Sequence, residues 1–301
     1  MFSTFIRLGL ALSSAAVLSS CGGNSVAETQ QSTAEGLFSG TYNVYLGATS
    51  PATTGTPTCT QNVLTFVEAT GLAYNFYPSA ANPALLYAAD EGSLAFGGNV
   101  MSSTNMLQVS LPGSPIPGCT PVAASRANSY ALTGSYVTGQ SMSGTISYPL
   151  AVNGQYIIST FGITNATGAV NSSFTYDTDY QGVQDLSHLA GTYSGMIGTS
   201  LSNDPVSFTI SPPSVPANSG NSLGVSIMTG TTASGCIYVG SVSPLFKGNG
   251  YTATLTSGPT CLLPTTQFSG LLYLNSKTNI AYAFMPNAAR SDGLVFSGTR
   301  N

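Results

Sequence analysis

The sequence predicts an all-β protein in which two tandem antiparallel β domains follow a signal peptide and a flexible tether. Three observations support this fold class. Short segments rich in Tyr, Phe, Val, Ile and Thr alternate with turns of Gly, Pro, Ser and Asn along most of the 301 residues. No segment repeats its apolar residues with the period of a helix. Charged residues make up 5% of the chain and hydrophobic residues 42%, so the chain can build a core although Ser, Thr and Asn replace charge on its surface.

The first twenty residues have the layout of a signal peptide. Arg7 is the only charge ahead of an apolar run over residues 8–18. That run suits the core of a signal peptide and is too short to span a bilayer as a helix. We therefore expect residues 1–20 to be cleaved during export.

The end of this segment, Leu18-Ser19-Ser20-Cys21, resembles the lipobox of bacterial lipoproteins. In that family the cysteine thiol is joined to diacylglycerol, and the amino group exposed by cleavage is acylated. The resemblance implies that Cys21 is lipidated and binds the membrane. Gly22 stands where an aspartate would alter sorting, which implies the outer membrane of a bacterial envelope, on its periplasmic or its exposed face. An ordinary secretory signal with an incidental cysteine is the alternative.

Composition divides the rest of the chain into three parts. Residues 21–36 hold the cysteine and an aromatic-free stretch that we interpret as a flexible tether. Strand patterns then occupy residues 37–182 and residues 183–301, and each length allows a core of its own. Near the boundary, residues 185–189 are expected to form one helical turn capped by Asp185.

The strand patterns are densest in the second half, where eight can be counted. They lie at residues 189–197, 206–211, 222–229, 234–242, 251–256, 267–274, 279–285 and 293–299. Several contain glycine, which marks bulges or bends where a sheet curls. Eight short antiparallel strands suit a small closed, lipocalin-like barrel or a two-sheet sandwich. The first half has similar patterns at residues 37–46, 62–68, 72–77, 93–97, 106–111, 129–137, 141–148, 155–163 and 170–176.

Two pairs of segments correspond between the halves. SGTYNVYL at 39–46 is similar to AGTYSGMI at 190–197, and VSLPGSPIPGC at 109–119 is similar to ATLTSGPTC at 253–261. We interpret them as two copies of one β unit. Convergence of strands that use few residue types is the alternative.

Beyond Cys21, four cysteines remain, an even number that an oxidising compartment would pair. Cys236 begins the fourth predicted strand of the second half and Cys261 follows the fifth. In an up-and-down sheet both stand at the same end. Cys59 and Cys119 flank the second to fifth strands of the first half in the same way. Because a disulfide needs Cα atoms within about 7 Å, we predict the pairs Cys59–Cys119 and Cys236–Cys261.

Catalytic groups do not gather in the sequence. His188 is the only histidine, no GxSxG motif accompanies it, and beside Ser187 it is interpreted as a surface residue. Asp90-Glu91, followed by Gly92, is typical of a hairpin turn more than of a glycosidase pair. We therefore expect a non-enzymatic protein without a cofactor, with a hydrolase of unrecognised site as an alternative.

One acidic segment partly matches a calcium loop. Asp177, Asp179, Gln181 and Asp185 fall at the first, third, fifth and ninth positions of an EF-hand loop, with glycine at the sixth. His188 takes the twelfth position, where a bidentate glutamate is needed, and no helices flank the segment. No metal site is therefore predicted, and these four residues are the candidates if one exists.

The second half resembles a recurring type of uncharacterised proteobacterial envelope lipoprotein. The matching segments are LAGTYSG (189–195), SGCIYVG (234–240), NGYTATL (249–255), Cys261, QFSGLLY (267–273) and DGLVFSGTR (292–300). The resemblance covers strands and cysteines and carries no catalytic motif. It implies a disulfide-containing β domain on an envelope lipoprotein.

From residue 21 onward the chain carries five basic and ten acidic residues without a basic stripe, which argues against nucleic-acid binding. The sequence thus favours a lipid-anchored envelope protein that binds a small-molecule or protein ligand without catalysis. Two-domain surface lipoproteins that take up iron-loaded host proteins are similar in domain layout. A structural or adhesive surface protein is the alternative of a different class.

Overall fold

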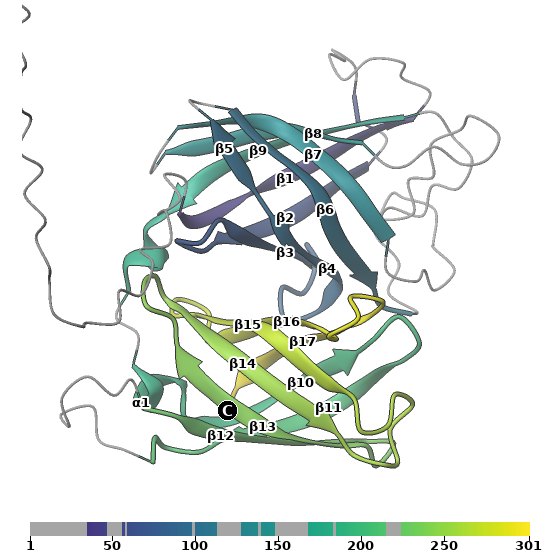
Figure 1. Cartoon of the computed structure of the whole chain (residues 1–301), viewed down its shortest axis with the longest axis vertical. Coiled ribbons are helices and arrows are strands. Elements are labelled where there is room, and N and C mark those ends of the chain that lie inside the picture. The colour runs from purple at the N-terminus through teal and green to yellow at the C-terminus, as the bar shows by residue number, and fades with distance from the viewer. Residues whose placement is uncertain are drawn as a thin grey trace, which may run out of the picture. The chain divides into compact units, whose positions relative to one another are not determined.

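A computed structural model describes residues 35–46, 56–57, 59–97, 100–112, 128–137, 140–147, 168–182, 185–214 and 224–301. These residues belong to one compact unit, Gln31–Asn301. Strands dominate them, and the helical elements among them are the 3-10 turn η2 (Thr178–Gln181) and the helix α1 (Leu186–Leu189) (Figure 1). The predicted all-β class is confirmed. None of the described helical segments is long and apolar enough to cross a membrane.

The second half forms a closed eight-stranded antiparallel barrel (Figure 1). Its strands are β10 (Gly191–Gly198), β11 (Asn203–Ile210), β12 (Ser226–Thr232), β13 (Ile237–Pro244), β14 (Gly250–Ser257), β15 (Gln267–Asn275), β16 (Ile280–Pro286) and β17 (Gly293–Arg300). Each strand pairs with its neighbours in sequence, and β17 closes the ring on β10. All eight predicted strands are found, and the barrel is the arrangement they adopt.

The first half forms a nine-stranded antiparallel sheet. Its strands are β1 (Gly36–Leu46), β2 (Cys59–Val67), β3 (Leu72–Pro78), β4 (Leu86–Ser93), β5 (Ala95–Gly97), β6 (Val100–Ser110), β7 (Asn128–Val137), β8 (Ser141–Ser147) and β9 (Gly168–Asp177). The order is β4-β3-β2-β1-β9-β8-β7-β6-β5, and β4 also pairs with β6, so the sheet curls back on itself. As in the barrel, the first strand pairs with both the second and the last.

One turn prediction in this half is wrong. Asp90 and Glu91 lie inside β4 and are buried, whereas the sequence indicated a hairpin turn. The strand escapes detection because it is buried on both faces and so shows no alternation of apolar and polar residues. The predicted strand at 155–163 lies outside the described residues.

The barrel interior is filled by its own side chains. Along β11, Val206, Phe208 and Ile210 point inward while the residues between them face outward, as alternation in a strand requires. Gly230 of β12 stands opposite Phe208, and a Cβ at this position would lie 2.6 Å from Cε1 of that ring. This glycine therefore makes room for an aromatic side chain in the core.

The outer face of β2, β3 and β4 packs against the outer face of β15, β16 and β17. Phe76 and Tyr282 lie with ring centroids 5.8 Å apart, and the Tyr282 hydroxyl donates a 2.8 Å hydrogen bond to the carbonyl of Pro83. Both faces of β3 and β16 are buried, because one covers a core and the other covers the partner sheet. The buried cluster of this contact comprises Leu37, Leu64, Phe66, Tyr74, Phe76, Leu86, Ala89, Leu107, Val109, Leu111, Tyr180, Leu271, Tyr273, Ile280, Tyr282, Phe284 and Val295.

The short helix between the two halves follows the prediction. α1 begins after Asp185, whose carboxylate accepts a 2.8 Å hydrogen bond from the backbone N–H of Ser187. Leu186 and Leu189 face the barrel core. The predicted cap and turn are thus confirmed.

Candidate functional site

Three hairpin loops meet at one end of the barrel. They join β10 to β11, β12 to β13 and β14 to β15, and consecutive antiparallel hairpins place alternate loops at the same end. The Cys236–Cys261 disulfide links the second loop to the third, with Cα atoms 4.8 Å apart. This predicted disulfide is confirmed, and it covalently fixes the rim of the barrel mouth.

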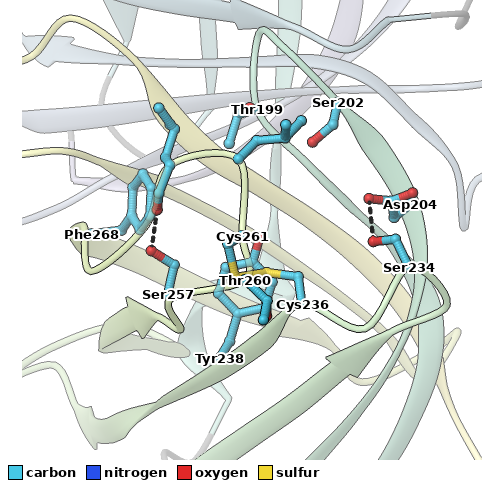
Figure 2. Close-up of a pocket in the computed structure, with 12 residues that line it drawn as sticks. Thr199, Ser202, Asp204, Ser234, Cys236, Tyr238, Ser257, Thr260, Cys261 and Phe268 are labelled. Atoms are coloured by element: carbon cyan, nitrogen blue, oxygen red, sulfur yellow. Dashed lines mark hydrogen bonds between the residues drawn. A yellow bond between two sulfur atoms is a disulfide. The ribbon is translucent and has the colours of Figure 1, made fainter.

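The loops enclose a pocket of about 330 Å³ at this mouth (Figure 2). That volume is near the lower end of the range for ligand pockets, which often occupy the mouths of β-barrels. The pocket is lined by Thr199, Ser202, Asp204, Ser234, Cys236, Tyr238, Ser257, Thr260, Cys261, Leu262, Leu263 and Phe268.

Hydrogen bonds within the chain link the loops of the rim to one another and to β11. Ser234 donates to the Asp204 carboxylate at 3.2 Å, which joins the β12–β13 loop to β11. Thr260 donates to the carbonyl of Gly235 at 3.2 Å, beside the disulfide. Ser257 donates to the carbonyl of Leu263. The pocket is therefore preformed, which lowers the entropy cost of binding.

Charge in the pocket comes from a single carboxylate. Asp204 is the only Asp, Glu, His, Lys or Arg among the lining residues. Burial, with a further contribution from Asp204, raises the pKa of Tyr238 to about 12. The Tyr238 hydroxyl is thus protonated at neutral pH, and it makes no hydrogen bond to another described residue. A ligand would find an anionic acceptor and an available donor in one pocket.

The pocket does not continue into the barrel. Phe268 on its lining is 1% exposed, and the interior beyond is filled by aromatic and aliphatic side chains. These include Tyr193, Phe208, Tyr251 and Phe296. The barrel therefore offers space at its mouth and not in a lumen.

A second, more open hollow of about 610 Å³ lies between the curled sheet and the barrel. Arg290 crosses it and donates from Nη1 to both carboxylate oxygens of Glu91, at 2.8 and 2.6 Å. Burial raises the pKa of Glu68 above its ordinary value of 4.5. Arg290 is the only Lys or Arg among the described residues that line this hollow, and it binds Glu91 of the first sheet. We therefore interpret the hollow as part of the contact between the two sheets and not as a ligand site.

Two predicted site residues lie outside the described residues. Cys21 is one of them, and so is Cys119, so that lipidation and the Cys59–Cys119 pair stay predictions. His188 is exposed on α1, where its carbonyl accepts a hydrogen bond from Arg300. The Ser187 hydroxyl donates to Asp185 at 2.5 Å. The Ser187 hydroxyl thus binds the N-cap residue of α1 and not the neighbouring His188.

The structure also places the four calcium-loop candidates. Asp179 is buried and accepts hydrogen bonds from Tyr273 at 2.5 Å and from Ser276. Asp177 pairs with Lys277 at 2.8 Å, Asp185 caps α1, and Gln181 is exposed at the end of η2. Within the described part of the chain, no three His, Cys, Asp or Glu side chains are grouped so as to hold a metal ion.

Asp204 and Tyr238 belong to no sequence motif and were not among the predicted site residues. The signal for them is indirect. The predicted Cys236–Cys261 disulfide brings two loops together, and residues beside those cysteines must then share the barrel mouth.

No protein-family model matches the chain, and a comparison with curated proteins finds no match. Among solved structures, the chain is similar to Aeromonas veronii immune modulator A, with 10% identity over 89% of this chain and 94% of that chain, at a TM-score of 0.35. It is also similar to a mutant of the vaccine antigen transferrin-binding protein B from Haemophilus parasuis Hp5, with 9% identity over 88% and 76% of the two chains, at a TM-score of 0.22. Likenesses at this level carry no function to this chain.

Proposed function

We propose that this chain is a lipid-anchored binding protein of the bacterial envelope and that its lipid lies in the outer membrane. Its barrel-mouth pocket would take a small ligand rich in hydrogen-bond donors. The observation that carries the proposal is the preformed 330 Å³ pocket, in which a carboxylate and several hydroxyls converge on a rim fixed by a disulfide.

Two features support export and anchoring. The Cys236–Cys261 disulfide belongs to an oxidising compartment, since thiols are kept reduced in the cytosol. The Leu18-Ser19-Ser20-Cys21 segment resembles a lipobox. Labelled palmitate should enter the protein in its host, and Cys21→Ser should release it from the membrane fraction. Unchanged fractionation of that variant would contradict the anchor.

The pocket favours one class of ligand by its charge. An anion would meet the Asp204 carboxylate with no cation among the lining residues to offset it. Hydroxyl or ammonium groups would instead donate to Asp204, while Tyr238 could donate in return. Phe268 and the leucines of the rim supply apolar contact. A saccharide-like or amine ligand therefore fits best.

Native mass spectrometry of the delipidated protein from its own host tests this proposal. We expect a retained small molecule in the wild type and little in Asp204→Asn or Tyr238→Phe. The first substitution removes the charge of the acceptor and the second removes a hydrogen-bond donor, and a loss of this size lowers affinity about tenfold. Ser241→Ala, on the outer wall of β13, is the control and should retain the ligand. Calorimetric titration with glucose, which has hydroxyls only, and with ethylamine, which has an ammonium group only, separates the hydroxyl from the ammonium source. Equal retention by all four proteins would contradict the pocket.

One observation favours the structural or adhesive alternative. Ile227 on β12 and Ile237 and Val239 on β13 are each about half exposed on the outer wall of the barrel, at 50%, 50% and 51%. Such an apolar patch on a solvent-exposed face can serve as a contact surface for another protein. Ile227→Ser with Val239→Ser should then reduce adhesion or self-association while leaving ligand retention unchanged.

A further inference from the structure

We infer that the loop Leu245–Asn249, between β13 and β14, is a membrane-contact element that places Phe246 in the lipid–water interface. The side chain of Phe246 is 89% exposed, the most exposed of the large hydrophobic side chains in the described part of the chain. An aromatic ring held fully in water is costly, and such rings are favoured at membrane interfaces. This inference rests on the proposed anchor at Cys21.

The loop is built to present this ring. Leu245 is packed among the buried residues between the two sheets, and its N–H donates to the carbonyl of Gly250 at 3.0 Å. Gly248 has φ 77°, and a Cβ there would lie 2.3 Å from the ring of Tyr180. Asn249 donates from its backbone to the carbonyl of Tyr180 at 2.9 Å. Leu245 on one side of Phe246 and Asn249 on the other are thus fixed to the protein, while the ring of Phe246 points into solvent.

The loop lies where the chain enters the fold. Lys247 pairs with Glu35 at 3.3 Å, and Glu35 directly precedes β1. Thirteen residues lie between Cys21 and Glu35, and even a fully extended segment of this length, end to end, spans at most about 50 Å. A lipid on Cys21 would thus allow this end of the protein to reach the bilayer, and the exposed Phe246 would favour contact at this end over the opposite one.

The charges at this end suit a lipid surface. The chain has only two lysines, and both are here: Lys247 pairs with Glu35, and Lys277 pairs with Asp177, which lies opposite Leu37 in the β1–β9 register. Lysine stems can lie along an apolar surface while the ammonium stays among head groups. Because each lysine has an acidic partner, the contact should depend on apolar insertion more than on anionic lipid.

The consequence is a defined orientation. The Phe246 loop precedes β14 and the pocket loop that carries Cys261 and Leu262 follows it, so the two lie at opposite ends of that strand. Eight residues of strand separate them by about 27 Å. With Phe246 in the interface, the pocket opens away from the membrane.

The chain contains no tryptophan, so a single substitution supplies a reporter. We compare Phe246→Trp with Leu262→Trp, an exposed position at the opposite end of the barrel. In both, residues 1–21 are replaced by a hexahistidine tag that binds nickel-chelating lipid in phosphatidylcholine vesicles. This attachment makes the measurement independent of acylation in cells and of ligand binding, whose failures would contradict only the proposed function.

On vesicles, the emission of F246W should shift to shorter wavelength, and acyl chains carrying bromine should quench most of it. The emission of L262W should keep its position and intensity, and added salt should change neither result. Circular dichroism confirms that both variants are folded. An unquenched F246W would overturn the inference, and equal quenching of both variants would overturn the orientation. As a second measurement, Phe246→Ser should lower residual vesicle binding after tag cleavage more than Leu262→Ser does, and equal binding would contradict the contact.

Discussion

Asp90 has a completely buried carboxylate inside the first sheet. Asn75 donates to it at 2.6 Å, and the Tyr77 hydroxyl donates to its other oxygen. We expect Asp90→Ala to lower the free energy of unfolding by about 2–6 kcal/mol, because two buried donors lose their acceptor at about 1–3 kcal/mol each. Urea unfolding of the chain from residue 22 measures the loss.

Tyr77→Phe is the matched control for this prediction. It removes one donor and leaves the carboxylate and Asn75 in contact, so its cost should be smaller, at about 1–2 kcal/mol. A cost for Tyr77→Phe equal to that of Asp90→Ala would show that the carboxylate contributes through this one bond alone.

The stability of the fold should depend on pH through the carboxyl group of Glu68. Burial raises the pKa of its carboxyl above 4.5, so the folded state binds this proton more tightly than the unfolded state. Its contribution to stability is therefore lost as the pH rises from 4.5 through the folded pKa. Glu68→Gln should be more stable than the wild type at pH 7, and the difference should vanish at low pH.

Thr70→Ala is the control for Glu68→Gln, because Thr70 affects the pKa of Glu68 in the direction opposite to burial. It donates to the Glu68 carboxylate at 3.2 Å, a bond that favours the ionised form. Thr70→Ala should therefore lose stability at pH 7 and lose little at low pH. If Glu68→Gln shows the same pH profile as the wild type, burial of this carboxyl does not set the stability.

At the scale of elements, the β16–β17 loop is fixed to the first sheet by one side chain. Arg290 binds the Glu91 carboxylate and also donates to the carbonyls of Glu91 and Asn105, at 3.2 and 3.0 Å. Arg290→Ala should cost about 2–3 kcal/mol, because a largely buried Glu91 is left without its cation.

Arg290 also has φ 51°. Arg290→Gly should thus be up to about 1 kcal/mol more stable than Arg290→Ala, since glycine adopts this region without steric cost. Equal unfolding midpoints for the wild type and both variants would show that the loop is held by other contacts.

Elements also differ in how well the sequence predicts them, and burial explains the difference. Strands such as β11 and β12 have one face in the core and one in water, so their alternation is visible in the sequence. β4 has no such contrast, and its Asp-Glu-Gly segment has the composition of a turn, so it was missed. The disulfide at the barrel mouth was predictable because it follows from strand order alone. Asp204 and Tyr238 were not, since they become neighbours only when the barrel closes.

At the scale of the whole molecule, the shared buried cluster makes the two sheets stabilise each other. Tyr282 of the barrel contacts Phe76 and the carbonyl of Pro83, and Ser297 donates to the carbonyl of Ala84 at 2.9 Å. A contact with its own buried apolar cluster is more apolar than the interfaces typical of domains that move independently. We therefore expect residues 35–301 to unfold as one cooperative unit.

Hydrogen exchange can test this cooperativity by perturbing one sheet and observing the other. Phe208→Ala empties part of the barrel core and should cost about 3–5 kcal/mol. If the sheets unfold together, amides of β2 and β3 lose as much protection as amides of β14 and β15, although Phe208 touches neither β2 nor β3. Adding Tyr282→Ala should weaken the contact, so that protection in β2 and β3 recovers relative to the barrel. Protection in β2 and β3 that is unaffected by Phe208→Ala alone would show two independent domains, as the lengths of the two halves would also allow.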